Sequence, residues 1–496
     1  MAKFYITAAI PYVNAKPHIG HALEFVQTDV IARYHKLKGF ETRMLSGGDE
    51  NALKNVQAAE KEKMLVQEFV DKNTKLFENL AHQLNVQFDV FQKGSDQSHH
   101  YPASQKLWEL CQKNGDIYKK KYKGLYCVGC ELFYTRDELD ENGECYEHPG
   151  KPLEEVEEEN YFFKLSDYTD KVLKLIESNQ LEIVPDFRRN EVLAFVKKGL
   201  EDISISRSNE RAKNWGVPVP GDDTQRMYVW FDALNIYQSG IGFGWDEESY
   251  KKWWPADVHV IGKGIIRFHA VYWPAFLMSA GLELPKKLFV HEYFTVDGKK
   301  MSKTLGNVID PVELIKKYGT DALRFYFLKY FSPFSDGDFS EEKFKTAYNA
   351  DLANGLGNLV ARVAKLCEKE DFEFTIFDYK NTKPPKVENS LILQAIEKGE
   401  FNEALQIIWQ SDIKWGHLWL NEDQSRSIRT TDQTINEQQP WTLDKIDLQN
   451  KLHLYVDNIR AIAYFLQPFM PETAEKILEQ FKGPKIKSSA PLFPRL

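Results

Sequence analysis

At 496 residues, the chain is long enough to form several domains with sizeable buried cores. Its hydrophobic content of 43% and charged content of 28% are typical of soluble globular proteins. A net charge of −9 excludes a surface that is basic throughout, although local basic patches can still bind nucleic acid. The candidate patches are residues 119–123, 207–213 and 482–487, each of which could equally be an ordinary solvated face.

The sequence contains no stretch typical of a signal sequence or a membrane span. Residues 1–3 lead directly into a short strand-like run. The most apolar helix-like stretch, 265–280, contains Arg267 and His269 and is too short to cross a bilayer. Five cysteines, three of them clustered, fit a reducing compartment and a metal site better than disulfides. We therefore expect a cytoplasmic protein without membrane contacts.

Strand-like and helix-like segments alternate from residue 3 to about residue 114, which predicts a parallel sheet built from strand–helix–strand units. Residues 115–220 break this pattern into short strands, turns and a glutamate-rich run, and we interpret them as an insertion between two halves of the sheet. Helical periodicity dominates from residue 310 to the end. Between these regions, strand-like runs return at 226–233, 257–262 and 288–291.

A short motif, Pro17-His18-Ile19-Gly20-His21, follows the first strand-like run and opens the first helix-like run. The start of a helix presents unpaired backbone N–H groups and the positive end of the helix dipole, so it can bind a phosphate. Gly20 allows a nucleotide to approach the backbone closely, and the imidazoles of His18 and His21 can bind phosphate oxygens. Considered alone, the same residues could simply cap a helix.

A second motif, Lys300-Met301-Ser302-Lys303-Thr304, lies in a segment that contains glycine and serine. Lysine is a compact, mobile point charge, which suits the charge that develops on a polyphosphate during transfer. Considered alone, this motif could be a solvated loop. In combination, the two motifs predict an enzyme that activates a carboxylate with ATP.

Cys127, Cys130, Cys145 and His148 form a Cys₃His set with a two-residue gap within each pair. Such gaps allow both members of a pair to reach one tetrahedral ion from a tight turn, and thiolates with one imidazole favour zinc. Four protein ligands indicate a structural site, because a catalytic zinc keeps one position open. The alternatives are unconnected cysteines in a loop and an independent nucleic-acid-binding finger.

The two motifs resemble the HIGH and KMSKS signatures of the class I aminoacyl-tRNA synthetases, with Thr304 where the signature usually has serine. The resemblance extends over nearly the whole chain and is closest to the methionyl-tRNA synthetase family, some of whose members carry one Cys₃His site in the same insertion. It implies an α/β protein with a Rossmann-like parallel-sheet catalytic domain, a zinc-knuckle insertion and an all-α anticodon-binding helix bundle. The implied domains are two catalytic halves, 1–114 and 221–290, the insertion, 115–220, a lysine-loop region, 291–340, and the anticodon-binding domain, 341–496.

The same resemblance implies a pocket for L-methionine. Asp49 would hold the ammonium group of the substrate through a charge-assisted contact. The side chains implied to enclose the thioether are Ile10, Tyr12, Trp230, Ala233, Tyr237, Ile265 and His269. Aromatic rings suit a polarizable sulfur atom. Without the resemblance, Trp230 and Tyr237 would be interpreted as core aromatics at the end of a strand.

The resemblance also implies the reaction. The methionine carboxylate attacks the α-phosphate of Mg²⁺-bound ATP, and the terminal adenosine of an elongator or initiator tRNA(Met) then accepts the amino acid. His18 and His21 would hold the phosphates, while Lys300 and Lys303 would close over the leaving pyrophosphate. The residues implied to bind ATP are Tyr12, Asn14, Gly20, Glu24, Gly262, Lys263 and Lys303.

In the C-terminal third, the resemblance assigns Asn358, Arg362 and Trp441 to recognition of the anticodon. Amide and guanidinium groups can bond to base edges, and an indole can stack on an unpaired base. Asn358 and Arg362 are four residues apart and would share one helix face, so in isolation they could be an ordinary surface pair. No appended tRNA-binding module follows, and we therefore expect a monomer.

Three stretches depart from the family pattern. Asn51-Ala52 replaces the usual His-Gly, and Gly264 replaces the usual acidic residue. Both departures lie near the expected ATP site, so the residues that contact the ribose and phosphates there are not assigned. Residues 411–433 form a longer and mostly polar stretch than the pattern has. The alternative functions are a nucleotidyltransferase with a similar first motif, a synthetase for leucine, isoleucine or valine, and a non-catalytic tRNA-binding protein. The branched-chain synthetases are disfavoured because the insertion is too short for a large editing domain.

Overall fold

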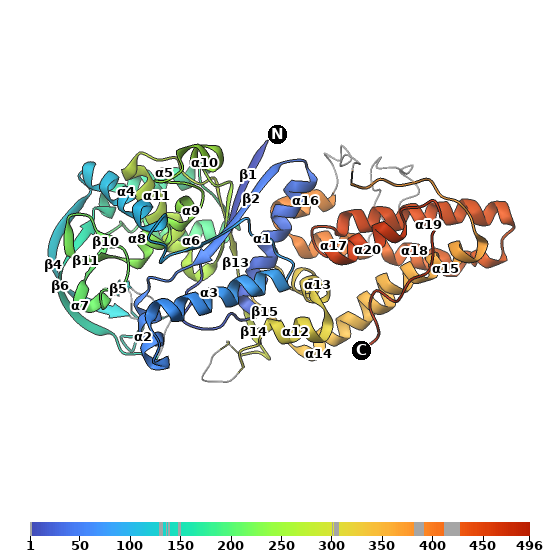
Figure 1. Cartoon of the computed structure of the whole chain (residues 1–496), viewed down its shortest axis with the longest axis horizontal. Coiled ribbons are helices and arrows are strands. Elements are labelled where there is room, and N and C mark those ends of the chain that lie inside the picture. Colours follow the sequence, from blue (N-terminus) through green and yellow to red (C-terminus); the bar gives the residue numbers. More distant parts are fainter. Residues whose placement is uncertain are drawn as a thin grey trace.

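The computed structural model describes residues 2–127, 132–134, 136, 139–146, 150–299, 301, 307–380, 391–410 and 427–496. Figure 1 shows an elongated molecule, with an α/β part at one end and a bundle of helices at the other. Within these described ranges, no helix is both long enough and apolar enough to cross a membrane.

The α/β part is built around a six-stranded sheet in the order β3-β2-β1-β12-β13-β7, in which every neighbouring pair is parallel. Its strands are β1 (Lys3–Ala8), β2 (Glu41–Gly48), β3 (Val90–Lys93), β7 (Glu182–Val184), β12 (Val258–Gly262) and β13 (Lys287–His291). This sheet confirms the predicted Rossmann-like fold. The strand order reverses between β1 and β12, and ligands of such sheets bind beyond the carboxyl ends of the strands at this point.

Helices cover the sheet, and α1 (Ile19–Leu37) is central among them because it follows β1 and packs against β1 and β2. The others in this part are α2 (Leu53–Glu62), α3 (Val66–Gln83), α4 (His100–Lys113), α8 (Val229–Ala233), α9 (Ile236–Ser239), α10 (Glu247–Trp253), the short turns η3 (Lys263–Ile265) and η4 (Phe268–Tyr272), and α11 (Trp273–Ala280). Both β1 and β12 are buried along most of their length, as expected for parallel strands covered on two faces.

Residues 229–233, predicted as part of a strand, form the short helix α8 instead. The preceding strand β11 ends at Met227 and belongs to a separate sheet in the order β10-β11-β9. Every residue of α8 is buried, Asp232 included, and a short run that is buried on all sides has no periodicity to distinguish a helix from a strand.

The segment predicted as an insertion forms a four-stranded sheet in the order β5-β4-β6-β8. Its elements, with those that follow it, are β4 (Ile117–Cys127), β5 (Leu132–Tyr134), β6 (Glu154–Phe163), η2 (Leu165–Tyr168), α5 (Thr169–Glu177), α6 (Asp186–Val196), β8 (Ile203–Ser204), β9 (Ser206–Ser208), α7 (Asn209–Ala212), β10 (Pro218–Val219) and β11 (Asp222–Met227). Between α5 and α6, strand β7 returns to the edge of the main sheet and pairs with β13. The predicted domain boundaries remain predictions.

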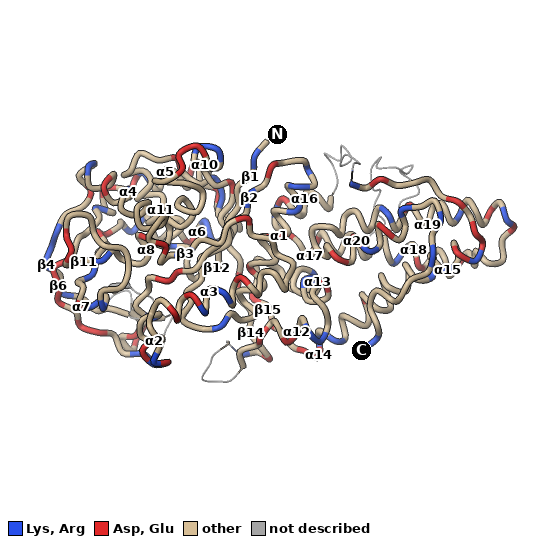
Figure 2. Tube along the Cα trace, viewed as in Figure 1, with Lys and Arg blue, Asp and Glu red and all other residues tan. Residues whose placement is uncertain are grey.

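The lysine-rich strand β4 lies opposite the glutamate-rich strand β6, at the outer edge of the α/β part in Figure 2. Lys121 faces Glu159 and Lys123 faces Glu157 across the pair, and Lys119 Nζ lies 2.9 Å from Asp222 Oδ2. The candidate basic patch at 119–123 is therefore surrounded by carboxylates, which favours the ordinary solvated face over a nucleic-acid contact.

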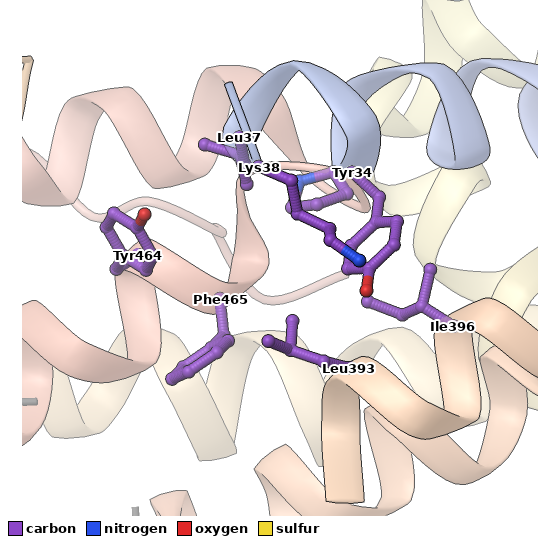
Figure 3. A pocket seen from close by; sticks show the side chains of 8 residues that line it. Tyr34, Leu37, Lys38, Leu393, Ile396, Tyr464 and Phe465 are labelled. Atoms are coloured by element: carbon purple, nitrogen blue, oxygen red, sulfur yellow. The ribbon is translucent and has the colours of Figure 1, made fainter. Parts of the chain in front are cut away.

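The helical part begins after β14 (Phe294–Val296), which pairs in parallel with β15 (Gly337–Phe339), a short strand between the second and third of its helices. Its helices are α12 (Pro311–Tyr318), α13 (Thr320–Tyr330), α14 (Glu341–Ala347), η5 (Tyr348–Gly357), α15 (Asn358–Glu370), α16 (Leu391–Lys398), α17 (Phe401–Gln410), α18 (Ile428–Gln438), η6 (Pro440–Thr442), α19 (Lys445–Leu466) and α20 (Pro471–Gln480). One hydrophobic core runs without interruption from the main sheet into these helices. A small apolar pocket lies at the joint, where the C-terminal end of α1 meets α16 and α19 (Figure 3).

Arg324 of α13 is a polar connection across this joint, and its side chain is fully buried. Its Nη2 lies 2.7 Å from Asp29 Oδ2 of α1, and its other hydrogen bonds go to the carbonyl oxygens of Leu84, Pro468 and Phe469. One guanidinium group thus connects α1, the end of α3 and the turn between α19 and α20.

Candidate active site

The first motif forms the start of α1, as predicted. His18 is the N-cap residue, and its Nδ1 accepts a hydrogen bond from the Gly20 N–H at 3.1 Å. In return, His21 Nδ1 accepts a hydrogen bond from the His18 N–H at 3.1 Å. A Cβ atom on residue 20 would lie 2.9 Å from His18 Cε1, so glycine is required for this close approach.

These hydrogen bonds fix how the two imidazoles are presented. Because each Nδ1 is an acceptor, each neutral ring carries its hydrogen on Nε2. The ring centroids are 3.9 Å apart. Burial, with a contribution from His18, holds the pKa of His21 well below its usual value. His21 is therefore a neutral N–H donor near pH 7, which can bind a phosphate oxygen.

The second motif lies against the first. The Ile19 N–H donates a hydrogen bond to the Ile309 carbonyl at 3.2 Å. The Met301 Cε atom lies 3.8 Å from the position that a Cβ on Gly20 would occupy. Lys300 and Lys303 lie outside the described residues, so their roles stay predictions. The described residues on either side nevertheless bring this segment to the N-terminal end of α1.

The residues predicted to enclose methionine form a continuous set of contacts. The Tyr12 ring meets the Trp230 ring edge-on at 6.1 Å, and Trp230 meets His269 at 6.4 Å. Trp230 also stacks on Phe268, which the sequence analysis did not single out, at 3.6 Å. Ile10, Tyr12 and Ile265 are partly buried against the same core that contains Trp230, Ala233 and Tyr237.

His269 and Tyr237 form a neutral pair within this set. Burial lowers the pKa of His269 to about 4. The Nδ1–H of His269 donates to the Ile265 carbonyl at 2.9 Å, so Nε2 accepts a hydrogen bond from the Tyr237 hydroxyl at 2.8 Å. The pair therefore adds no charge to the lining, which suits an apolar side chain.

Asp49 lies directly after β2, next to these aromatic residues. Its side chain is 2% exposed, and its backbone N–H donates to the Pro11 carbonyl at 2.9 Å. Tyr12 and Asp49 also pair as an isolated parallel bridge. The segments that follow β1 and β2 are thus held side by side, which places a carboxylate at the edge of the aromatic set.

Asn51, one of the departures from the family pattern, is buried and hydrogen-bonds two segments that are distant in the sequence. Its Nδ2 donates to the Gly94 carbonyl at 2.7 Å and to Asp232 Oδ2 at 2.8 Å. Burial raises the pKa of Asp232, whose Oδ1 lies 3.9 Å from His100 Nε2. An amide can donate to this carboxylate without adding a charge, and Asn51 thereby fixes the turn that follows Asp49.

Glu24 is held on the inward face of α1. Its Oε1 accepts a hydrogen bond from the Ala9 N–H at 3.0 Å, and its Oε2 lies 3.0 Å from His291 Nε2. Asn14 is partly buried in the loop between β1 and α1. His291 ends β13 and escaped the sequence analysis, because its partner is far away in the sequence and no local pattern marks it.

Gly262 and Gly264 both lie under the ring of Tyr293, a second residue that the sequence analysis missed. The Gly264 N–H donates to the Tyr293 hydroxyl at 2.9 Å, and a Cβ on Gly264 would lie 2.5 Å from that oxygen. A Cβ on Gly262 would lie 2.9 Å from Tyr293 Cε1. The departure at Gly264 therefore has a steric reason, since Tyr293 occupies the space of a side chain there.

Lys263 belongs to an ion-pair cluster at the ends of β12 and β13. Its Nζ lies 2.7 Å from Glu292 Oε2 and 2.8 Å from Asp336 Oδ1. Arg188 of α6 bonds the other oxygen of Glu292 through Nε at 2.7 Å. These partners neutralise Lys263, so binding of a phosphate by Lys263 would have to displace a carboxylate.

The described thiols of the predicted zinc site are buried. Cys127 ends β4 and is 3% exposed, and Cys145 lies between β5 and β6 and is 1% exposed. Cys130 and His148 lie outside the described residues. Among the residues that are described, no three or more His, Cys, Asp or Glu side chains are grouped so that they could hold a metal ion. The zinc site therefore stays a prediction.

The predicted anticodon residues lie in the helical part, far from this site in Figure 1, where α15 and α18 mark their position. Asn358 begins α15 and is exposed. Arg362 of the same helix binds α18 through Asp432 Oδ1 at 2.6 Å and Asn436 Oδ1 at 3.0 Å. Trp441 lies in η6, directly beyond α18, and is 51% exposed. A half-exposed indole is available for stacking, whereas Arg362 already has protein partners.

Comparison with known proteins identifies the family. A family profile described as tRNA synthetases class I (M) matches residues 4–364. The methionine–tRNA ligase of Brucella melitensis is 42% identical over 495 residues, which cover 98% of this chain and 93% of the relative. This chain belongs to the methionine–tRNA ligase family of class I tRNA synthetases.

Further members of this family agree in sequence and in structure. The methionine–tRNA ligase of Thermotoga maritima is 39% identical over 96% of this chain and 75% of the relative. The structure of Mycobacterium tuberculosis methionyl-tRNA synthetase in complex with methionyl-adenylate superposes with a TM-score of 0.88 at 37% identity, and each chain is covered completely. The resemblance inferred from the two motifs is thereby confirmed for the fold and the family.

Proposed function

We propose that this protein ligates L-methionine to tRNA(Met) at the expense of ATP, as a methionine–tRNA ligase, and that it serves elongator and initiator tRNA. The observation that carries this proposal is the meeting of the two motifs. The Met301 side chain and the Ile309 carbonyl both lie at the first turn of α1, beside Gly20 and Ile19. Two segments far apart in the sequence thus border one phosphate-binding helix start.

In the first step, the methionine carboxylate attacks the α-phosphate of ATP, and pyrophosphate leaves. The substrate supplies its own nucleophile, so the protein contributes positioning and charge stabilisation. The Nε2–H groups of His18 and His21 donate to phosphate oxygens, and Lys300 and Lys303 balance the charge of the leaving pyrophosphate. Mg²⁺ accompanies ATP as part of the substrate. In the second step, the ribose of the terminal adenosine attacks the adenylate, and AMP leaves.

Selection of methionine rests on the aromatic set and Asp49. The carboxylate of Asp49 binds the substrate ammonium. The rings of Tyr12 and Trp230 and the neutral Tyr237–His269 pair surround the thioether. An apolar pocket separates near-isosteres by about 1–3 kcal/mol, so homocysteine and leucine are the competitors to test.

The insertion holds one structural zinc ion in this proposal. Cys127, Cys130, Cys145 and His148 are the ligands, and the burial of the two described thiols suits a soft ion. Metal analysis of the purified protein is expected to give about one equivalent of zinc. Less than about half an equivalent would contradict the site.

The experiment that tests the function is exchange of labelled pyrophosphate into ATP, run separately with each standard amino acid. Methionine alone is expected to support fast exchange. Exchange that depends on leucine, isoleucine or valine instead would identify a different synthetase. If no amino acid supports exchange, the remaining alternatives are a nucleotidyltransferase and a non-catalytic tRNA-binding protein. Sedimentation of the active enzyme is expected to show a monomer.

Recognition of the anticodon can be tested at Trp441. The exposed indole is expected to stack on an unpaired base, a contact worth about 1–3 kcal/mol. Trp441→Ala should therefore reduce kcat/KM for tRNA by about tenfold or more and leave pyrophosphate exchange unchanged. Charging at the wild-type rate by this variant would make Trp441 a residue without a role in tRNA binding.

A further inference from the structure

His291 and Glu24 form a nearly buried contact between a strand and the helix that carries the first motif. His291 Nε2 lies 3.0 Å from Glu24 Oε2, and the two side chains are 5% and 13% exposed. His291 ends β13, and Glu24 lies in α1. Glu24 is among the residues expected to bind ATP, whereas the reaction described above gives His291 no role.

The contact lies at the carboxyl edge of the main sheet. His291 is opposite Gly262 in the register of β13 and β12, and its Cε1 lies 3.5 Å from the position that a Cβ on Gly262 would occupy. Glu24 is four residues beyond Gly20 and therefore on the same face of α1. Because ligands of such sheets bind at this edge, His291 and Glu24 lie where the nucleotide is expected.

The hydrogen bonds of His291 require two protons on its ring. Nδ1 lies 2.9 Å from the carbonyl oxygen of Glu292, which can only accept, so Nδ1 must donate. Nε2 faces Glu24 Oε2, which is also an acceptor when the carboxylate is ionised. A neutral imidazole has one N–H and can satisfy only one of these oxygens. The contact therefore contains one proton more than a neutral imidazole and a carboxylate hold when they are apart.

The additional proton belongs on the imidazole, because an imidazole ordinarily holds a proton more tightly than a carboxylate. The neighbouring carboxylate of Glu292 is bound by Arg188 and Lys263, so its charge is balanced separately. His291 is thus a cation whose charge balances that of Glu24.

This balance matters because ATP is an anion. A carboxylate that is nearly buried is screened little by water or salt, so an unbalanced Glu24 would repel the nucleotide. Paired with an imidazolium, Glu24 adds no net charge to the site. Its remaining lone pairs can still accept hydrogen bonds from the hydroxyl and amino groups of adenosine.

We propose that His291 is a positioning residue for ATP, and that as an imidazolium it neutralises Glu24 and orients its carboxylate toward the adenosine. His291 acts through Glu24. Methionine is bound by other residues, so the effect of the pair falls on ATP. The proposal rests on the proposed function, because it assigns a residue to the ATP substrate of that reaction.

His291→Gln separates the charge from the hydrogen bond, because its amide can still donate to Glu24 but is neutral. In methionine-dependent pyrophosphate exchange, KM for ATP should rise by about tenfold, as expected when a charge-assisted hydrogen bond becomes a neutral one. KM for methionine should change by less than about twofold. His99→Gln is the matched control, since His99 Nδ1 also lies 3.0 Å from a carboxylate, that of Asp96, but its side chain is 45% exposed. This control should keep the wild-type KM for ATP.

Glu24→Gln provides the background that isolates the charge. Its amide can accept the Ala9 N–H and donate to a neutral His291, so no charge remains to be balanced. The dissociation constant for ATP, which can be measured without turnover, should rise by about tenfold for His291→Gln in the wild-type background. In the Glu24→Gln background, the same substitution should change it by less than about twofold. This comparison is insensitive to the effect of Glu24→Gln alone.

Nitrogen-15 NMR of the full-length protein, labelled at its histidines, reports the protonation of the ring nitrogens. At about pH 7, one histidine of the wild-type protein should have both ring nitrogens protonated and should become singly protonated in Glu24→Gln. This measurement does not require that His291→Gln folds.

Three results would overturn the proposal. One is an unchanged KM for ATP in His291→Gln, and another is an equal effect of this substitution in the two backgrounds. The third is an NMR spectrum in which no histidine changes its protonation in Glu24→Gln. A wild-type enzyme without methionine-dependent exchange would instead overturn the proposed function, so the two failures are distinguishable.

Discussion

The two ends of α1 use polar side chains in different ways. At the N-terminal end, His18 and His21 are partly buried and present N–H donors next to Gly20. At the C-terminal end, Tyr34 and Lys38 both donate to Glu397 of α16, beside the apolar pocket shown in Figure 3. One end is the proposed phosphate-binding site, and the other end connects the α/β part to the helices.

The difference shows that a shifted pKa does not by itself identify a functional residue. Burial lowers the pKa of both His21 and His35, the latter to about 4. His35 is partly buried, stacks on Phe4 at 3.4 Å between ring centroids, and its Nδ1 lies 2.8 Å from the Ile31 carbonyl oxygen of the same helix. His21 lies at a helix start that faces the second motif. Position on the helix, and not protonation, separates the catalytic candidate from the structural residue.

The largest expected effect concerns the middle of the helix, where two arginines bind Asp29. Arg324→Met leaves a buried carboxylate without its fully buried cation and three carbonyls without a donor, so the free energy of unfolding should fall by about 3–5 kcal/mol. Arg33→Met is the matched control, because Arg33 binds the same carboxylate with a side chain that is 23% exposed. Thermal unfolding measures both. Equal losses would show that burial of Arg324 is not what matters.

The next effect concerns the N-terminal end. His21→Ala removes one donor to the phosphates, and pyrophosphate exchange should slow by about 10²–10³. The unfolding temperature should change little, since the helix loses one capping hydrogen bond. His82→Ala, at an exposed position of α3, is expected to keep the wild-type rate. Near-normal exchange by His21→Ala would contradict the role of His21 as a donor to the phosphates.

A smaller effect is expected at His35, the partly buried histidine near the C-terminal end of α1. The folded pKa of His35 is about 4, below the usual 6.5, so the unfolded chain binds its proton first as the pH falls. The stability that depends on neutral His35 is present above pH 6.5 and is lost between pH 6.5 and 4. At pH 5.5 this loss is about 1.4 kcal/mol. His35→Gln should lose less stability on acidification, measured by unfolding temperature against pH, while His82→Gln should behave as wild type.

The smallest effect concerns the ion pair at the C-terminal end. Lys38 Nζ lies 2.6 Å from Glu397 Oε1, but the two side chains are 37% and 49% exposed. Lys38→Met should therefore change the free energy of unfolding by about 0–1 kcal/mol, and the change should shrink as salt is added. A loss of more than about 2 kcal/mol in the free energy of unfolding, independent of salt, would mean that this ion pair is a main contact between α1 and α16.

Much of this arrangement follows from local sequence. The run from Phe4 to Ala8 and the motif around Gly20 predict β1, the start of α1 and the phosphate-binding role together, because a strand, a turn and a capped helix are each encoded within a few residues. The aromatic residues around the methionine pocket were predicted only from the resemblance to the family. In the sequence, Trp230 and Tyr237 have no pattern that separates a pocket from a core.

The parts that were missed depend on contacts between distant segments. Tyr293 covers Gly264, Arg188 binds Glu292, and His291 meets Glu24, yet none of these pairs lies within one element. Only the parallel register of β12 beside β13, with α1 next to them, brings such residues together. The helix at 229–233 was missed for a different reason, since a run of five residues that are all buried, Asp232 included, shows no alternation between a buried and an exposed face.

The uninterrupted core between the sheet and the helices has a consequence for dissecting the protein. Phe289 of β13 packs against Phe401 of α17, and a Cβ on Gly399 would collide with the Phe289 ring. A catalytic fragment produced by cutting the chain before α14 would uncover this aromatic surface and strip Arg324 of two of its carbonyl acceptors. Such a fragment should aggregate, and so a minimal enzyme would need a redesigned surface at the cut.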